Sequence, residues 1–162
     1  MLKILHEPDV ALHGVCAPVS DFGPEVLDLA RALIETLNGA GGAGLAAPQV
    51  GLHVRMILMA VPGDDVKVLV NPVLVHGWNV VATVEGCLSL PKRPFQLLRF
   101  DNVGYRGQDT GGNAVEGYLQ GFSAHCFQHE CDHLDGTLIS DKGRPFVWPP
   151  STIHTAGPSA SV

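Results

Sequence analysis

Residues 128–133 bring two histidines and a glutamate together in the pattern H-E-x-x-H. His129 and His133 are four positions apart, so on an α-helix their rings lie on one face and can reach the same metal ion. Glu130 is offset from His129 by about 100° around such a helix, so it can stand near the ion without binding it. This arrangement is typical of sites in which a carboxylate works beside a metal-bound water. The pattern therefore predicts a helix that carries two metal ligands.

Two imidazoles leave a metal site incomplete, so the chain should supply a third ligand. Other histidines and carboxylates are candidates, and so are the cysteines, which are Cys16, Cys87, Cys126 and Cys131. Cys126 would crowd the ion from the same arc of helix as His129, and Cys131 should point away from that arc. Cys16 has no reactive neighbours in the sequence. Cys87 follows a glycine at the end of a strand-like run, where it can present a thiolate and a bare backbone N–H together.

Three separated motifs resemble those of the peptide deformylase family. The first is the glycine-rich G-A-G-L-A-A-P-Q at residues 42–49, and the second is E-G-C-L-S at residues 85–89. The third is Q-H-E-C-D-H-L at residues 128–134. They occur in the family's order, and the similarity extends from residue 4 to about residue 136. A triple match at fitting spacing is far more specific than the histidine motif alone.

The resemblance implies one divalent metal ion held by Cys87, His129 and His133, with one position left open for water. One thiolate and two imidazoles accept several metals, and affinity order alone does not decide among them. Members of the family characteristically use Fe(II). Fe(II) is therefore the expected ion, and Zn, Ni or Co are the alternatives.

The resemblance also implies the reaction, which is hydrolytic removal of the formyl group from the N-terminal formyl-methionine of new peptides, with release of formate. Glu130 would take a proton from water and return it to the departing amine. The side-chain amide of Gln49 and the backbone N–H of Leu88 would stabilise the oxyanion. The polar residues expected to hold the site together rather than to react are Glu85, Gln128 and Asp132.

The substrate is expected to bind as an added strand beside the glycine-rich motif. Gly42 and Gly44 lack a Cβ, so a peptide backbone can approach them and the turn can adopt a positive φ. Phe122, His125 and Cys126 share the helix face of His129 and would line an apolar pocket for the formyl-methionine side chain; His125 is also an alternative metal ligand. The expected substrate-binding residues are Gly42, Ala43, Gly44, Leu45, Glu85, Gly86, Phe122, His125 and Cys126.

Hydrophobic patterning predicts an α+β fold in which antiparallel β-sheets pack around a central metal-bearing helix. The expected helices cover residues 24–37 and 121–134. The expected strands cover residues 54–61, 66–70, 73–75, 80–84, 103–106 and 114–119. Residues 1–142 would form the catalytic domain. Residues 143–162 contain four prolines and would form an irregular, flexible C-terminal tail.

Composition limits the partners of the chain. Its 162 residues suit one domain, and its net charge is −6 without a basic stripe, so no nucleic acid is expected to bind directly. No apolar run approaches the roughly 20 residues that span a membrane. Four cysteines without a paired framework favour a reducing compartment, so the cytoplasm is expected. Formyl-methionyl nascent peptides are the expected partners; the ribosome is a candidate partner, and a monomer is the expected state.

Two alternatives belong to other functional classes. The chain could be a different H-E-x-x-H metallohydrolase, such as a peptidase, which would cleave unformylated peptides. It could also be a non-catalytic binding relative that keeps the fold, for which loss of Glu130 would be the signal. The intact motifs at residues 42–49 and 85–89 favour the deformylase over both.

Overall fold

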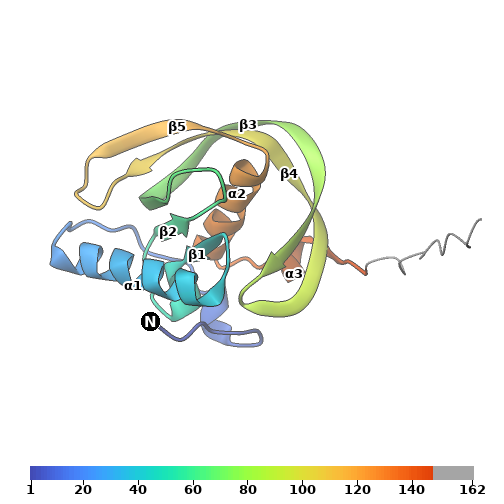
Figure 1. Cartoon of the computed structure of the whole chain (residues 1–162), viewed down its shortest axis with the longest axis horizontal. Coiled ribbons are helices and arrows are strands. Elements are labelled where there is room, and N and C mark those ends of the chain that lie inside the picture. Colours follow the sequence, from blue (N-terminus) through green and yellow to red (C-terminus); the bar gives the residue numbers. More distant parts are fainter. Residues whose placement is uncertain (148–162) are drawn as a thin grey trace, which may run out of the picture.

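The computed structural model describes residues 1–147 and has an α+β fold, as the sequence predicts (Figure 1). The elements follow one another as η1 (Val10–His13), α1 (Pro24–Ala40), β1 (Gly44–Ala46), η2 (Ala47–Val50), β2 (Met56–Met59), β3 (Lys67–Cys87), β4 (Leu90–Gln108), β5 (Ala114–Gln120), α2 (Phe122–Leu134), α3 (Ile139–Lys142) and β6 (Arg144–Pro145). The expected strands at residues 54–61 and 66–70 correspond to β2 and the start of β3, which pair as an antiparallel hairpin through residues 56–59 and 67–70.

The described strands hydrogen-bond in one antiparallel path, β1-β2-β3-β4-β5, with β6 added to β4. β3 and β4 are 21 and 19 residues long and curve around α2 (Figure 1). The prediction of two strands at residues 73–75 and 80–84 is wrong, since β3 runs through both. Gly77 does not interrupt it: Gly77 pairs with Val103, and the ring of Phe100 fills the space where a Cβ would stand.

The sequence analysis missed the first part of β4, residues 90–102. Pro91 and Pro94 lack the N–H that a strand interior needs and argue against a strand there. Both prolines lie between Leu90 and Phe95, where the pairing with β3 shifts register. Their missing donors therefore fall outside the regular ladder, which resumes at Phe95.

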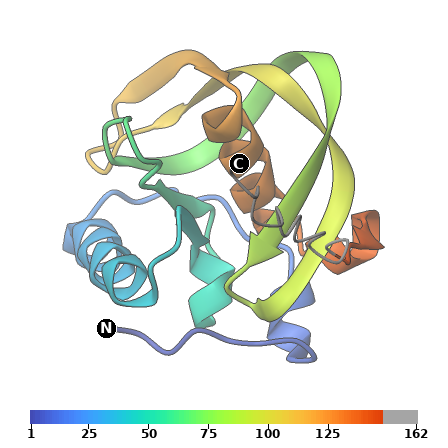
Figure 2. The ribbon, with the colours of Figure 1, turned by 45° about the vertical axis from the view of Figure 1, so that its right-hand side comes forward.

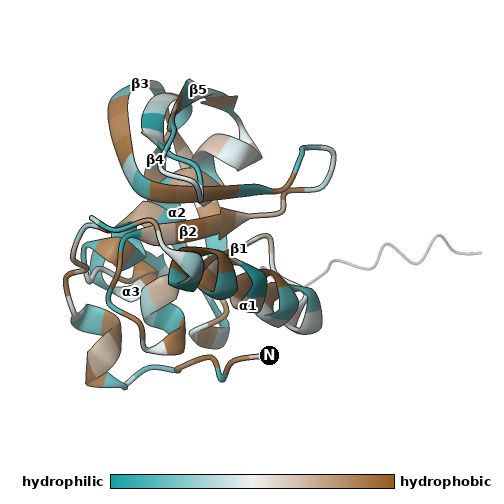
Figure 3. Cartoon of the chain, turned by 90° about the vertical axis from the view of Figure 1, so that its left-hand side faces the viewer, coloured by the Kyte–Doolittle hydropathy of each residue, from teal (hydrophilic) through white to brown (hydrophobic). Residues whose placement is uncertain are grey.

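α1 begins with a proline in its first turn and ends at Gly41, whose φ of 71° is the left-handed conformation that glycine adopts easily. It extends three residues beyond the expected end at residue 37. Its apolar face packs on β1 and β2, whose hydrophobic residues appear brown in Figure 3. The buried residues of this face are Val26, Ala30, Leu33 and Leu37. This layer closes the side of the sheet opposite α2.

α2 occupies the centre of the molecule, within the curve of β3 and β4 (Figure 2). It matches the helix expected over residues 121–134. Phe127 and Leu134 are fully buried in the core beneath the sheet. A helix buried on most of its surface has little freedom to shift, so the side chains that it carries are held in place.

The chain beyond α2 returns to the sheet. Arg144 and Pro145 form β6, pairing with Gln96 and Phe95 at the start of β4. The remainder of the expected tail, residues 148–162, lies outside the described residues. Among residues 1–147, no helix is both long enough and apolar enough to span a membrane.

Candidate metal centre and active site

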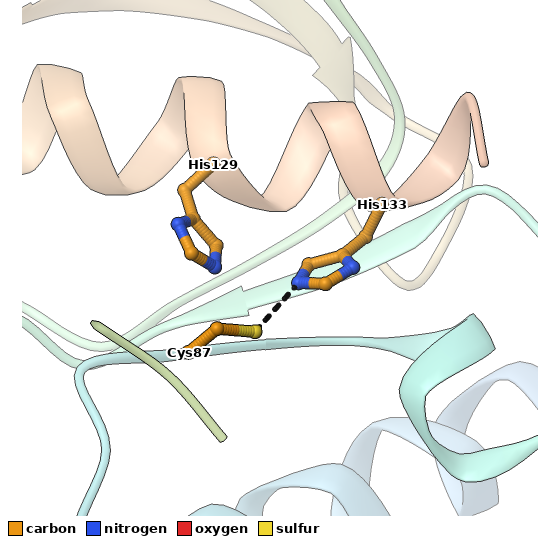
Figure 4. Close-up of side chains that lie close together, drawn as sticks. All are labelled: Cys87, His129 and His133. Atoms are coloured by element: carbon orange, nitrogen blue, oxygen red, sulfur yellow. Dashed lines mark hydrogen bonds between the residues drawn. The ribbon is translucent and has the colours of Figure 1, made fainter. Parts of the chain in front are cut away.

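Cys87, His129 and His133 come together at the centre of the molecule (Figure 4). Cys87 ends β3, while both histidines project from α2 toward it. One ligand atom from each residue lies within 4.8 Å of the others, and the Sγ of Cys87 is 3.3 Å from the Nε2 of His133. One sulfur and two imidazole nitrogens that converge in this way fit a divalent transition metal.

A buried ion network holds the ring of His129. Glu85 accepts a hydrogen bond from Nδ1 of His129 at 2.9 Å, which leaves Nε2 as the other ring atom that can bind a metal. Arg99 donates two hydrogen bonds to Glu85, at 2.8 and 2.9 Å, and another to Asp132 at 2.6 Å. Burial opposes the charged form of Glu85, but hydrogen bonds from Arg99 and His129 hold its pKa far below the usual range.

The two histidines differ in their electrostatics. Burial alone would lower the pKa of His129, but hydrogen bonding to Cys87 and Glu85 raises it to about 10. Burial, reinforced by repulsion from His129, lowers the pKa of His133 well below its ordinary value. The surroundings of His129 therefore favour positive charge, while His133 is held neutral, the form in which an imidazole binds a metal.

Glu130 is 3% exposed, and its Oε2 has no hydrogen-bond partner among the described residues. Burial raises its pKa to about 7, although the positive charge of His129 opposes the shift. A carboxylate that titrates near neutral pH can both accept and return a proton. The orphaned oxygen and the raised pKa suit a group that exchanges protons at the metal centre.

The glycines of the first motif act differently from the expectation. Neither Gly42 nor Gly44 has a positive φ; the left-handed residue of this turn is Gly41. Gly44 is required for space, because a Cβ there would lie 2.3 Å from Oε1 of Glu130 and 2.8 Å from Sγ of Cys126. The backbone of β1 can therefore approach Glu130 only because residue 44 has no side chain.

Gln49 is fixed with its amide group toward the metal ligands. Its Oε1 accepts a hydrogen bond of 2.8 Å from the N–H of Ala46. Its Nε2 donates to Oγ of Ser89 at 3.2 Å and lies 3.6 Å from Sγ of Cys87. These three contacts, one at Oε1 and two at Nε2, orient the amide so that its N–H groups face Cys87. Leu88, the other expected donor, lines the same cavity.

A cavity of about 540 Å³ opens beside these residues. The expected substrate-binding residues that line it are Gly42, Ala43, Gly44, Glu85, Gly86, Phe122, His125 and Cys126. Leu45 does not line it. Side chains alternate across a strand, so Leu45 packs under α1 while its neighbour Ala46 faces α2. His125 is not among the grouped metal-binding residues; its Nε2 lies 3.1 Å from a carboxylate oxygen of Asp101.

Two parts of the site are not among the site residues expected from the sequence. The first is Arg99, which joins Glu85 to Asp132; Asp132 thus acts on Arg99 and Lys142, not on a histidine. The register in which Arg99 pairs with Val81 and Phe95 pairs with Glu85 puts Arg99 and Glu85 on the same face, but it depends on the unpredicted start of β4. The second is residues 90–94, which form one side of the cavity.

Comparison with known proteins gives a consistent result. The sequence model of the family described as polypeptide deformylase matches residues 1–146. Peptide deformylase 2 of Streptomyces coelicolor is 43% identical over 139 residues, covering 83% of this chain and 78% of that protein. A peptide deformylase structure from Thermotoga maritima is 35% identical with a TM-score of 0.84, covering 88% of this chain and 97% of that one. A class I type b peptide deformylase from Acinetobacter baumannii, with Met-Ala-Ser bound, is 32% identical with a TM-score of 0.84, covering 88% of this chain and 98% of that one.

Proposed function

The chain belongs to the peptide deformylase family and is a metal-dependent hydrolase that removes the N-formyl group of nascent polypeptides, and on this premise we propose how its residues divide the reaction. Cys87, His129 and His133 hold a single divalent metal ion. The observation that carries this assignment is the convergence of their three ligand atoms within 4.8 Å, at the edge of the cavity.

Fe(II) is the metal that we propose for this centre, with Zn, Ni or Co as alternatives. The donor set of one thiolate and two imidazoles accepts all four. When bound, the ion supplies Lewis-acid chemistry, polarising the formyl carbonyl and lowering the pKa of water. The thiolate of Cys87 also makes a ferrous centre sensitive to oxidation.

Glu130 is the proposed acid–base residue. In the hydrolysis, water adds to the formyl carbon, the C–N bond breaks, and formate and a free amine leave. Glu130 takes the proton that water loses and returns it to the departing nitrogen. The amide of Gln49 and the N–H of Leu88 donate hydrogen bonds to the developing oxyanion. Glu85 keeps His129 in position through its bond to Nδ1.

The peptide is proposed to lie as an extended strand along residues 42–44, with its formyl-methionine side chain against Phe122, His125 and Cys126. The relative from Acinetobacter baumannii binds Met-Ala-Ser, a short peptide that begins with methionine. Residues 1–142 form the proposed catalytic unit. The enzyme is proposed to act as a monomer in the cytoplasm, on peptides emerging from the ribosome.

The test is formate release from formyl-Met-Ala-Ser by protein purified without oxygen, with the metal content measured in parallel. Glu130→Gln should bind one metal ion per chain but lose about 10²- to 10⁴-fold in kcat, the usual contribution of acid–base catalysis. Cys87→Ala should lose both the metal and the activity. A metal-loaded wild-type protein that releases no formate would overturn the proposal, and a fully active Glu130→Gln variant would remove Glu130 from its role.

A further inference from the structure

The mouth of the cavity carries a cation without a partner. The acidic side chains that line the cavity are Glu85 and Glu130, and the basic ones among lysine and arginine are Lys92 and Arg93. Glu85 is bound by Arg99, and Arg93 is bound by Glu7. Lys92 is exposed, and within residues 1–147 its ammonium has no hydrogen-bond or ion-pair partner. It is therefore the one full charge on the cavity wall that is both accessible and uncompensated there.

The backbone at Lys92 is unusual. Its φ is 61°, and the other described residues that are not glycine and share a positive φ are Asn71 and Asn79. Asparagine tolerates this left-handed conformation, whereas a lysine adopts it only when the surrounding structure enforces it. Here the flanking Pro91 and Pro94 restrict the segment, and both line the cavity. The chain thus holds Lys92 at a fixed place on the rim.

The rim faces the path that a peptide must take. The metal ligand Cys87 and the rim residues 90–94 belong to the same end of the β3–β4 hairpin, which lies beside β1 and η2 (Figures 1 and 2). Residues 42–44, along which the peptide is proposed to lie, line the same cavity as the rim. A peptide bound there with its formyl group at the metal centre would extend toward the rim with the residues that follow formyl-methionine.

We propose that Lys92 is a specificity-determining residue that binds a carboxylate on the two residues following formyl-methionine. The enzyme would then favour acidic nascent N-termini over basic ones. This inference rests on deformylation at the site described above. Arg93 contributes less because its guanidinium is held by Glu7 and lies 5.7 Å from the centre of the Phe95 ring.

The effect should appear in KM. The proposed contact of Lys92 is with the residues that follow formyl-methionine and not with the formyl group, so it should bind the ground state and the transition state equally and leave kcat nearly unchanged. An exposed ion pair typically changes affinity by about two- to fivefold, and salt weakens it. We therefore expect a preference of that size in 50 mM NaCl and a smaller one in 0.5 M NaCl.

The experiment uses three formylated peptides with amidated C-termini, so that only side chains differ in charge. They are formyl-Met-Asp-Asp-Ser-amide, formyl-Met-Asn-Asn-Ser-amide and formyl-Met-Lys-Lys-Ser-amide. For the wild type, KM should rise in that order. Lys92→Gln should remove most of the difference and Lys92→Glu should reverse it. Lysine, glutamine and glutamate incur the same cost in adopting a positive φ at position 92. The three proteins should therefore have the same stability, and differences in KM should reflect the side-chain charge.

Arg31→Glu is the control, because it makes the same change in net charge on the exposed face of α1, away from the cavity. It should leave the order of the peptides unchanged. The proposal is overturned if Lys92→Glu keeps the wild-type preference, or if Arg31→Glu shifts the preference equally. Failure of deformylation itself would be recognised separately, as absent formate release from the neutral peptide by the wild type.

Discussion

Two arginines of β4 bind glutamates in opposite surroundings. Arg99, which does not line the cavity, has a side chain that is 3% exposed, and its partner Glu85, which does, also touches His129. Arg93, at the mouth, is 53% exposed and binds Glu7. The inner pair is enclosed and bonded to His129, a proposed metal ligand, whereas water competes for the outer pair. The same arginine–glutamate pair can therefore hold a site residue in position when it is buried, and contribute little when it is exposed.

Removing the inner arginine should give the largest effect. Arg99→Met leaves Glu85 and Asp132 without their shared cation, and an uncompensated buried charge costs about 3–5 kcal/mol. We expect the free energy of unfolding, measured by urea denaturation, to fall by that amount. Arg31→Met, which removes an exposed pair with Asp28 on α1, should cost at most about 0.5 kcal/mol. Equal losses in the two variants would contradict the distinction between inner and outer pairs.

A steric change at the inner end should have the next largest effect. Gly44→Ala places a Cβ within 2.3 Å of the Glu130 carboxylate, so the carboxylate must move. Displacing a catalytic group by about 1 Å can cost up to about 10²-fold, and we expect kcat for formate release to fall about 10- to 100-fold. Gly39→Ala on α1, where the added Cβ meets only the side chain of Met1, should not change kcat. An unaltered rate in Gly44→Ala would mean that Glu130 is not constrained by β1.

The outer pair should give the smallest effect, and one that depends on pH. Hydrogen bonds from Arg93 and then Ser140 lower the pKa of Glu7. A lowered pKa in the folded state adds stability above pH about 4.5, and that stability is lost as the pH falls through the folded pKa. Arg93→Gln should thus be less stable than the wild type by about 0.2–1 kcal/mol at pH 7.

The gap between Arg93→Gln and the wild type should close as the pH falls from about 4.5 through the lowered pKa of Glu7, because Glu7 is protonated in both proteins only below that pKa. Thermal unfolding at pH 7 and at pH 3 measures it. A gap that stays constant across this range would show that Arg93 stabilises the fold by packing against Phe95 and not through its charge.

The sequence predicted the parts of this molecule that depend on local pattern. The face of α2 follows from the four-residue spacing of its histidines, and α1 follows from its apolar periodicity. The local setting of Cys87, after a glycine at a strand end, and the order of the motifs both pointed to it as the third ligand. Tertiary pairing was harder to predict: the prolines at 91 and 94 hid the start of β4, and with it Arg99. Local propensity cannot reveal a strand whose prolines fall in a register shift.

Side-chain roles within a correctly identified motif were also partly hidden. Leu45 belongs to the glycine-rich motif, but strand alternation turns it into the α1 core. Gly44 was expected to let a peptide backbone approach and to adopt a positive φ, but its φ is not positive, and its lack of a Cβ also makes room for Glu130. The face that a residue occupies and the residue opposite it both depend on how helices and strands pack together. The sequence motifs alone do not reveal that packing.

The position of Cys87 and His133 has a consequence for folding. They are 46 positions apart, one at the end of a strand and the other on the central helix. An ion bound to both joins them as a reversible cross-link, which removes loop-closure entropy from the unfolded chain much as a disulfide does. The ion proposed for catalysis would therefore also link the sheet to the central helix. Loss of the ion would therefore lower the stability of the fold as well as abolish the activity.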